Sequence, residues 1–213
     1  TTIVEDESIR LWHQGDDVLL LSFKTKLHVM GPGVIAGLER AIAEAEANYR
    51  ALVIWHADAA EGGAFSAGAD LQAMLPLFMS GGVKAIEPVV ARLQQAHLKL
   101  KYAQVPVVAA VAGLALGGGC ELMMHASRRV VALESYIGLV EVGIGLLPAG
   151  GGLKEIALRA AQAAQGHDRT EDRRRPAQHG RAGGAGFVQP PARRQARRLR
   201  EALRVAVADG EAQ

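Results

Sequence analysis

The sequence has little cysteine, few aromatic residues and no long apolar run. Cys120 is the only cysteine, which excludes a disulfide framework and a cysteine-rich zinc site. Its neighbours, Gly119 and Glu121, are typical of a buried small side chain and not of a reactive nucleophile. No run of about 20 residues is apolar and free of charge, so the sequence predicts no membrane contact.

The sequence also begins without methionine and without the features of a secretory signal. Its first residues, TTIVEDESIR, are acidic where such a signal is basic and then apolar. We therefore expect a cytoplasmic protein. The missing methionine fits a processed start or a module of a longer chain. With 213 residues, 49% of them hydrophobic, the chain is long enough to bury one core.

Lysine does not occur after Lys154, and arginine replaces it there. Ten arginines lie between residues 167 and 200. From Gln165 to Gln195, Phe187 and Val188 are almost the only large apolar residues, and such a composition buries too little surface to order a chain. The sequence therefore predicts one domain over residues 1–164 and an anomalous Arg/Gly/Ala-rich segment over residues 165–213, either disordered or read out of frame.

Two hypotheses account for this basic segment. Loss of Lys, Ile and Leu in favour of Arg, Gly, Ala and Pro is what an out-of-frame reading of GC-rich DNA gives, and re-reading the coding DNA in the other frames tests it. Alternatively, the arginines contact RNA or another acidic partner. Because aromatic residues are not interleaved with the arginines, the sequence argues against nucleic acid. Its last part, ARRQARRLREALRVAVADG, is compatible with a short basic helix.

The first 164 residues alternate between patterns typical of strands and of helices. Apolar runs predict buried strands at 18–23, 51–57, 105–113 and 128–133. Helical spacing predicts helices at 34–48, from Asp70, at 86–102, from near Cys120 and at 153–164. This alternation predicts an α/β fold.

The stretch GLALGGGCELMMHA places three glycines directly before Cys120 and Glu121, at a junction between a predicted strand and a predicted helix. Glycine lets the backbone approach a ligand, and the first turn of a helix supplies N–H groups that lack intrahelical partners. The alternative is that the glycines only permit a tight turn or close packing. The sequence contains neither GxGxxG nor GxxxxGK[ST], so it gives little support for a dinucleotide or nucleoside triphosphate site.

A second loop of small residues, AFSAGAD, also follows a predicted strand and precedes a predicted helix. Backbone N–H groups from two such loops can converge on one oxygen and form an oxyanion hole. Two acids accompany these loops. Glu121 lies among Gly, Cys, Leu and Met, and Glu141 among Val, Gly and Ile. An apolar setting raises the pKa of a carboxyl group and suits it to general acid or base catalysis, although most glutamates are solvated surface charges.

Three motifs, AFSAGADLQAML, GLALGGGCELMM and EVGIGLLPAGGG, resemble the crotonase superfamily and most closely its enoyl-CoA hydratases, over roughly residues 8–160. The resemblance implies a spiral of ββα units. The start, ESIRLWHQGDDVLLLSFKTK, is similar to the hydratase module of multifunctional fatty-acid β-oxidation proteins. Family members continue after the PAGGG loop with helices that close over the acyl group, and none is recognisable here after about Ala164.

The resemblance also implies the site and its chemistry. The oxyanion hole would be the N–H groups of Ala69 and Gly118, and the catalytic acids Glu121 and Glu141. Residues lining the CoA part of the substrate would be Ser66, Ala67, Gly68, Asp70 and Leu71. The implied reaction is reversible addition of water to a 2-trans-enoyl-CoA, with CoA as part of the substrate and no metal or redox cofactor.

Other outcomes stay open within the same resemblance. Isomerases that shift a double bond from position 3 to position 2 can work with one acid, so the retention of two acids favours hydration without excluding isomerase or bifunctional activity. The family forms trimers or hexamers, but the atypical C-terminal segment puts this assembly in question. A scaffold that has lost its activity is a further alternative.

Overall fold

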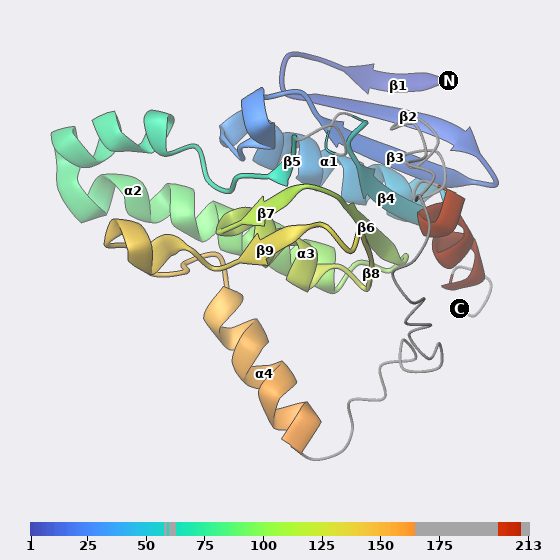
Figure 1. The fold of residues 1–213 in the computed structure, drawn as a ribbon. Coiled ribbons are helices and arrows are strands. Elements are labelled where there is room, and N and C mark those ends of the chain that lie inside the picture. The colour runs from blue at the N-terminus through green and yellow to red at the C-terminus, as the bar shows by residue number, and fades with distance from the viewer. Residues whose placement is uncertain (58, 60–62, 165–199, 210–213) are drawn as a thin grey trace, which may run out of the picture.

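The computed structural model describes residues 1–57, 59, 63–164 and 200–209 (Figure 1). Its larger sheet has six strands in the order β1-β2-β3-β4-β6-β8, and its smaller sheet has three in the order β5-β7-β9. The larger sheet comprises β1 (Thr2–Glu5), β2 (Ile9–Gly15), β3 (Val18–Phe23), β4 (Ala51–Trp55), β6 (Val107–Val111) and β8 (Arg128–Val131). The smaller sheet comprises β5 (Ala64–Ser66), β7 (Leu114–Leu116) and β9 (Tyr136–Gly138).

The helices follow the strands in a regular order. Up to residue 164 they are α1 (Pro32–Asn48), α2 (Leu71–Lys101), α3 (Gly118–His125) and α4 (Gly152–Ala164), with short 3₁₀ turns η1 (Lys26–His28) and η3 (Glu141–Ile144). The units β4-β5-α2 and β6-β7-α3 each place one strand in the larger sheet, one in the smaller sheet and then a helix. The third unit, β8-β9-α4, includes η3 before its helix. The predicted α/β spiral of ββα units is therefore confirmed.

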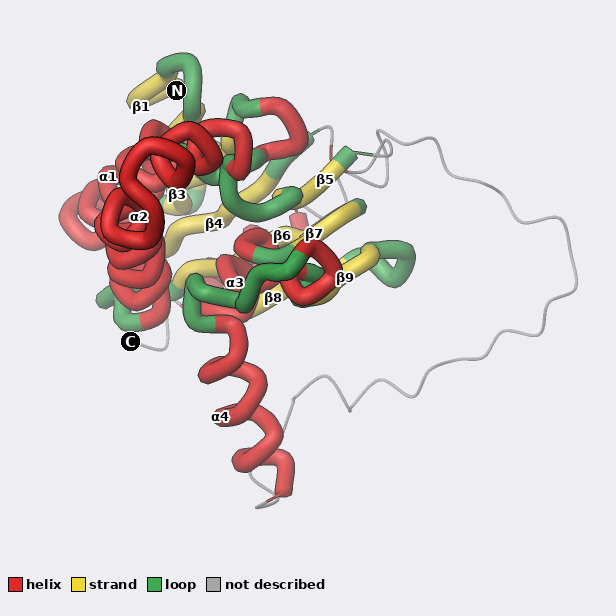
Figure 2. The backbone as a smooth tube through the Cα atoms, turned by 90° about the vertical axis from the view of Figure 1, so that its left-hand side faces the viewer, coloured by secondary structure: helices red, strands yellow, loops and turns green. Residues whose placement is uncertain are grey.

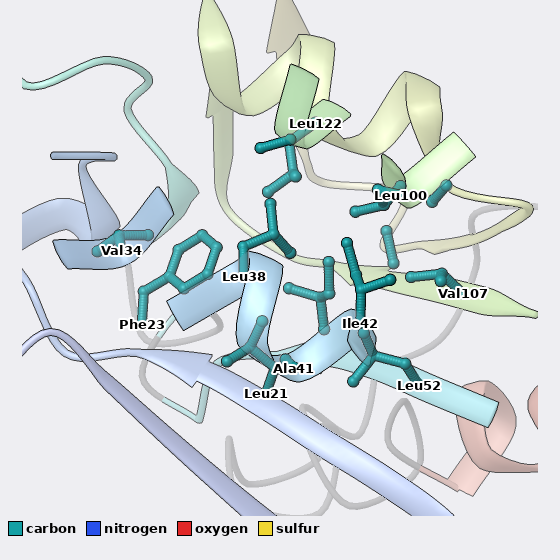
Figure 3. Packing of buried hydrophobic residues seen from close by; sticks show 14 of the residues in the cluster. Leu21, Phe23, Val34, Leu38, Ala41, Ile42, Leu52, Leu100, Val107 and Leu122 are labelled. Carbon is teal, nitrogen blue, oxygen red and sulfur yellow. The ribbon is translucent and has the colours of Figure 1, made fainter. Parts of the chain in front are cut away.

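Strands β3, β4 and β6 of the larger sheet are buried on both faces, which explains the continuous apolar runs in these strands. Strands β3, β4, β6 and β8 pair in parallel, and successive side chains alternate between faces. In β3, Leu19 and Leu21 pack into the main core with α1, whereas Val18 and Leu20 face the opposite side. Figure 3 shows Leu38 and Ile42 of α1 lying between the sheet and Leu122 of α3.

A helix at residues 200–209 covers the second face of the larger sheet. Ala202 and Ala206 of this helix are fully buried and belong to the cluster that contains Val53 and Val108 of the sheet. Arg128 of β8 pairs with Asp209 at 3.2 Å. The possible short basic helix near the C-terminus is therefore present over these residues. The remainder of the 165–213 segment, and with it nine of the ten clustered arginines, lies outside the described residues.

We predict that Ala202→Glu lowers the free energy of unfolding by at least about 2 kcal/mol, because it forces a carboxylate against the apolar sheet face. Ala208→Glu makes the same change on the exposed side of the same helix and is expected to change stability by less than about 0.5 kcal/mol. Urea unfolding measures both. Equal stability of the two variants would show that this helix does not pack on the sheet.

Helix α2 turns back on itself at Gly82, which has φ 60° and ψ −149° (Figure 1). By length and composition alone this helix is apolar enough to cross a membrane. The non-helical backbone at Gly82 divides it into two arms, so it is not one continuous helix. One such helix is weak evidence for a membrane span. The two predicted helices, from Asp70 and over 86–102, correspond to the two arms of α2.

Candidate active site

The loops that follow β5 and β7 lie against each other. A Cβ added to Gly68 would come within 3.0 Å of the Gly118 nitrogen and 2.9 Å of the Leu116 oxygen. Likewise, a Cβ on Gly118 would lie 3.3 Å from the nitrogen of Ala69. Only residues without side chains allow this approach, so the glycines of the two sequence motifs bring the two backbones together.

The N–H group of Ala69 is directed toward the second loop. Met30 forms an isolated parallel bridge with Ala69, in which the Met30 N–H donates to the Gly68 oxygen at 2.8 Å and the Asp70 N–H donates to the Met30 oxygen at 3.3 Å. Adjacent N–H groups of an extended chain point in opposite directions. The Ala69 N–H therefore points away from Met30, toward the side where Gly118 lies.

The N–H group of Gly118 lies in the first turn of α3. Gly117 precedes the helix with φ 52°, and its own N–H donates to the Gly138 oxygen of β9 at 2.9 Å. The first bond of the helix runs from the Glu121 N–H to the Gly117 oxygen, also at 2.9 Å. The Gly118 N–H comes before that bond and has no intrahelical acceptor. It is thus free to bind an oxygen at the positive end of the helix dipole.

Glu121 is almost fully buried, at 2% exposure. Its Oε1 accepts a hydrogen bond from the Gly152 N–H at 2.8 Å. Burial raises the pKa of Glu121, and the nearby carboxylate of Glu141 raises it further. Hydrogen bonds from the backbone of Gly152 and Gly150 act in the opposite direction but do not cancel the rise. A carboxyl group of raised pKa is suited to taking up a proton near neutral pH.

Glu141 approaches the same place from η3. A Cβ on Gly117 would lie 3.2 Å from its Oε1, so the carboxylate rests on the turn that precedes α3. Its Oε2 is buried and has no hydrogen-bond partner among the described residues. A buried carboxylate oxygen without a partner is costly unless a ligand or water satisfies it. The Oε2 of Glu141 is therefore available to accept a hydrogen bond from a water molecule or a ligand in the site.

These groups line one pocket of about 200 Å³. Ala69, Gly118, Glu121 and Glu141 all contribute to it, as predicted from the sequence. Among the described residues, the charged side chains that line it are those of Asp70, Glu121 and Glu141. Apolar side chains from α1 and the residues just before it, from both arms of α2 and from the η3 region form most of the remainder. These are Met30, Ile35, Leu71, Met74, Leu77, Val89, Val90, Leu93, Val140, Ile144, Leu146 and Leu147.

Four of the five residues expected to line the CoA part of the substrate border this pocket: Ala67, Gly68, Asp70 and Leu71. Asp70 also caps α2, because its Oδ1 accepts from the Ala73 N–H at 3.1 Å. Ser66 is fully buried and does not line the pocket. Its hydroxyl donates to the His28 oxygen at 2.8 Å and accepts from the Gly68 N–H at 3.1 Å, so its side chain holds the loop in shape.

Gly150 and Gly152 have a role that sequence analysis missed. Both act on Glu121 through their backbone N–H groups, and a Cβ on Gly150 would lie 2.3 Å from the Glu121 Oε2. Glycine is therefore needed at position 150 to admit the carboxylate. The run of three glycines is visible in the motif EVGIGLLPAGGG, but its target is about 30 positions earlier in the chain. Cys120 is buried, as expected, and burial raises the pKa of its thiol to about 11.

Glu155 of α4 is a buried carboxylate that forms an ionic cluster with partly exposed cations. Its carboxylate accepts from Lys101 at 2.6 Å and from Arg159 at 2.9 Å. Burial alone raises the pKa of Glu155, but these hydrogen bonds outweigh it and hold the pKa at about 2. The cluster ties α4 to the end of α2.

We predict that Glu155→Gln lowers the free energy of unfolding by about 1–3 kcal/mol at pH 7, because solvent partly screens the cations that pair with it. A depressed pKa stabilises the folded state above the ordinary value of 4.5, and this contribution is lost as pH falls toward about 2. The difference from the unsubstituted protein should therefore shrink over that interval in urea unfolding. A difference as large at pH 3 as at pH 7 would contradict the assignment. Glu7→Gln, at an exposed position, provides the control.

Comparison with known proteins places this arrangement in a family. The enoyl-CoA hydratase/isomerase profile matches residues 17–163. The chain belongs to the enoyl-CoA hydratase/isomerase family. The matched range includes Ala69, Gly118, Glu121 and Glu141 and ends before the Arg-rich segment.

Relatives of this enoyl-CoA hydratase/isomerase chain include much longer proteins. It is 38% identical over 166 residues to a protein of Bacillus subtilis named "Probable 3-hydroxyacyl-CoA dehydrogenase". The aligned region covers 78% of this chain and 20% of that relative. It is 33% identical to a peroxisomal fatty acid beta-oxidation multifunctional protein of Oryza sativa, over 61% of this chain and 17% of the relative. The chain thus spans about a fifth of the length of the curated relatives it matches.

Solved structures of the family share the fold. An enoyl-CoA hydratase from Polaromonas sp. JS666 superposes with a TM-score of 0.64 at 27% identity, over 70% of this chain and 57% of the other. An enoyl-CoA hydratase from Bacillus anthracis superposes with a TM-score of 0.61 at 22% identity, over 70% and 57% of the two chains. These matches confirm the crotonase fold of the described domain.

Proposed function

We propose that the chain is an enoyl-CoA hydratase, which adds water reversibly to 2-trans-enoyl-CoA thioesters in fatty-acid β-oxidation. The observation that carries this proposal is the convergence of four groups on one pocket. Two are backbone N–H groups, of Ala69 and Gly118, and two are carboxylates, of Glu121 and Glu141. The first pair suits a carbonyl oxygen and the second a water molecule.

The backbone pair would bind the thioester carbonyl. As water adds to the β-carbon, electron density moves to the carbonyl oxygen and an enolate forms. The N–H groups of Ala69 and Gly118 stabilise this oxygen more strongly in its charged form than in the neutral substrate, and such selective stabilisation lowers the barrier. Each donor of this kind is typically worth about 3–4 kcal/mol.

The carboxylate pair would handle the protons. Glu121 takes a proton from water as the water oxygen bonds to the β-carbon, Glu141 delivers a proton to the α-carbon, and passage of a proton from Glu121 to Glu141 returns both acids to their starting state. Because both acids hold the same water, they act as a pair. The reverse reaction removes the α-proton to Glu141 and expels water with a proton from Glu121, so atoms and charges balance in both directions.

The shape of the pocket supports a fatty acyl thioester. Apolar side chains of α1, α2 and η3 suit an acyl chain. Ala67, Gly68 and Leu71, in the loop after β5 and at the start of α2, suit the pantetheine arm. CoA enters as part of the substrate, and the steps above use no metal or redox group. The names of two relatives, a fatty acid beta-oxidation multifunctional protein and a 3-hydroxyacyl-CoA dehydrogenase, support a place in β-oxidation and in a longer multifunctional chain.

Isomerisation of a 3-enoyl-CoA to a 2-enoyl-CoA is the second candidate. It needs the same oxyanion hole but only one acid to move a proton between two carbons. Glu141 lines the same pocket as Glu121, and its buried Oε2 has no hydrogen-bond partner among the described residues. Two acids on one pocket favour hydration, which requires both. The geometry is also compatible with an enzyme that catalyses both reactions.

We predict that the full chain consumes crotonyl-CoA, measured by loss of the absorbance of its conjugated double bond, and forms 3-hydroxybutyryl-CoA. The same preparation is given 3-hexenoyl-CoA, with the product separated by chromatography. Hydration of crotonyl-CoA at a rate above that of 3-hexenoyl-CoA isomerisation supports the hydratase. Isomerisation without hydration would assign the isomerase instead. Activity on neither, in a folded protein, would mean an inactive scaffold.

A further inference from the structure

Two buried histidines lie behind Glu121, outside the pocket lining. His97 is on the second arm of α2 and His125 on α3, and their exposed fractions are 0% and 2%. The two imidazole rings stack with their centroids 5.0 Å apart and an angle of 23° between their planes. Neither ring has a role in the steps proposed above.

Each ring donates a hydrogen bond to a backbone carbonyl beside the reacting groups. The His97 Nδ1 lies 2.9 Å from the Gly150 oxygen, and the His125 Nδ1 lies 2.7 Å from the Glu121 oxygen. A carbonyl oxygen only accepts, so both Nδ1 atoms carry a proton. Burial lowers the pKa of His97 to about 4, so its ring is neutral at pH 7 and the donor at Nδ1 is fixed.

The loop at residues 150–152 rests directly on these rings. A Cβ on Gly150 would lie 3.1 Å from the His97 Cε1, and a Cβ on Gly151, which has φ 108°, would lie 3.0 Å from the His125 Cε1. The same loop donates the Gly152 N–H to the Glu121 Oε1 at 2.8 Å. The rings therefore hold one side of the loop, and the loop holds the Glu121 carboxylate on its other side.

We propose that His97 and His125 are positioning residues for Glu121: through the Gly150 oxygen and ring contact they fix the backbone N–H groups that orient and stabilise its carboxylate. The inference rests on the proposed function for its catalytic consequence, but the arrangement itself concerns only Glu121 and the loop. The histidines contact neither the thioester nor the water. They act through the geometry of the loop.

Other charged groups also face this region. Glu141 of η3 faces Glu121 from the pocket side. Glu155 and Arg159 of α4 and Lys101 of α2 lie on the far side of His125, whose Nε2 is 3.6 Å from the Glu155 Oε1. Cys120 precedes Glu121 on α3 and is held as the neutral thiol because its pKa is raised. Substitution of His97 leaves all of these groups in place, which makes it a cleaner test than substitution of His125, whose ring lies beside Glu155.

The test compares His97→Leu with His97→Asn. Leucine removes the donor to the Gly150 oxygen, whereas the Asn amide nitrogen occupies the place of Nδ1 and keeps it. With leucine, the N–H groups of Gly150 and Gly152 lose their support, and since they lower the pKa of Glu121, that pKa should rise further. We expect kcat for hydration to fall about tenfold to a hundredfold with KM nearly unchanged, and His97→Asn to restore most of it.

The direct readout is the pKa of Glu121, followed by NMR titration of ¹³C-labelled glutamate side chains. His97→Leu should raise this pKa and move the acid limb of the kcat profile to higher pH, while His97→Asn leaves both near their original values. His56→Leu is the matched control. It also replaces a buried, stacked imidazole, but one that contacts Phe23, His28 and Phe65, and it should leave the pKa of Glu121 unchanged.

The outcomes separate the two claims. A Glu121 pKa that is the same in His97→Leu as in the unsubstituted protein overturns the positioning role, whatever happens to the rate. Equal shifts in His97→Leu and His56→Leu also overturn it, because they would reflect general loosening of the core. A raised pKa in His97→Leu alone supports the role. If that result is found in a protein that does not hydrate crotonyl-CoA, the positioning role stands and the proposed function fails.

Discussion

Glu121→Gln and Glu141→Gln are each expected to lower kcat for crotonyl-CoA hydration by about 10²- to 10⁴-fold. The change keeps the size of each side chain but removes its ability to accept and release a proton, and general acid–base catalysis contributes a factor of this order. Both side chains line the pocket. Glu121 is buried, so a carboxylate ion from the buffer cannot take over its role. Steady-state kinetics at saturating substrate measures the effect.

The double variant should be little worse than either single variant. Both acids act on one water molecule, and residues that act as a unit show strongly non-additive losses. Glu7→Gln, at an exposed position in the turn before β2, is the control and should keep full activity. Independent, multiplying losses in the double variant would contradict the shared water. Full activity in either single variant would remove that acid from the mechanism.

Gly150→Ala is expected to reduce hydration by about 10²-fold or more. Its Cβ would lie 2.3 Å from the Glu121 Oε2 and 2.9 Å from Cδ, so the carboxylate must move. Displacement of a reacting group by about 1 Å costs a factor of this size. The acid, the oxyanion hole and the pocket lining all remain, so the loss of hydration activity reports only on the position of the Glu121 carboxylate. Kinetics with crotonyl-CoA and thermal unfolding are measured together.

Gly143→Ala is the matched control for this variant. It adds the same methyl group to a glycine of η3, but no atom of the described residues lies within 4 Å of the added Cβ. Activity and stability should both stay close to those of the unsubstituted protein. If Gly150→Ala were as active as Gly143→Ala, the Glu121 carboxylate would not occupy the place assigned to it.

The large buried elements could be predicted from the sequence because each contains an unbroken apolar run or a regular helical spacing of apolar residues. Strand β3 matches its predicted range 18–23, since both of its faces are buried and nearly all its residues are apolar. The start of α2 at Asp70 was marked by a capping side chain. The three-residue strands β5, β7 and β9 were missed because they are too short to show a period, and only their pairing with one another defines them.

The candidate site was predicted in part for a similar reason. The glycines and acids lie in three local motifs. Glu121 and Glu141 could be named from their apolar settings, and Ala69 and Gly118 from the resemblance of these motifs to the crotonase superfamily; all four line one pocket. Groups that hold Glu121 could not be named in this way. Gly152 is 31 residues from the carboxylate it binds, and His97 is 53 residues from the carbonyl it supports. Such pairs depend on the packing of α2, α3 and the loop before α4.

The most direct test of the account is a crystal structure of the full chain with butyryl-CoA, a saturated thioester that cannot be hydrated. The account predicts the thioester oxygen about 2.7–3.1 Å from both the Ala69 and the Gly118 nitrogens. It also predicts a water molecule bound between the carboxylates of Glu121 and Glu141, on the side of the β-carbon. A thioester bound elsewhere, or with its carbonyl turned away from these two N–H groups, would contradict it.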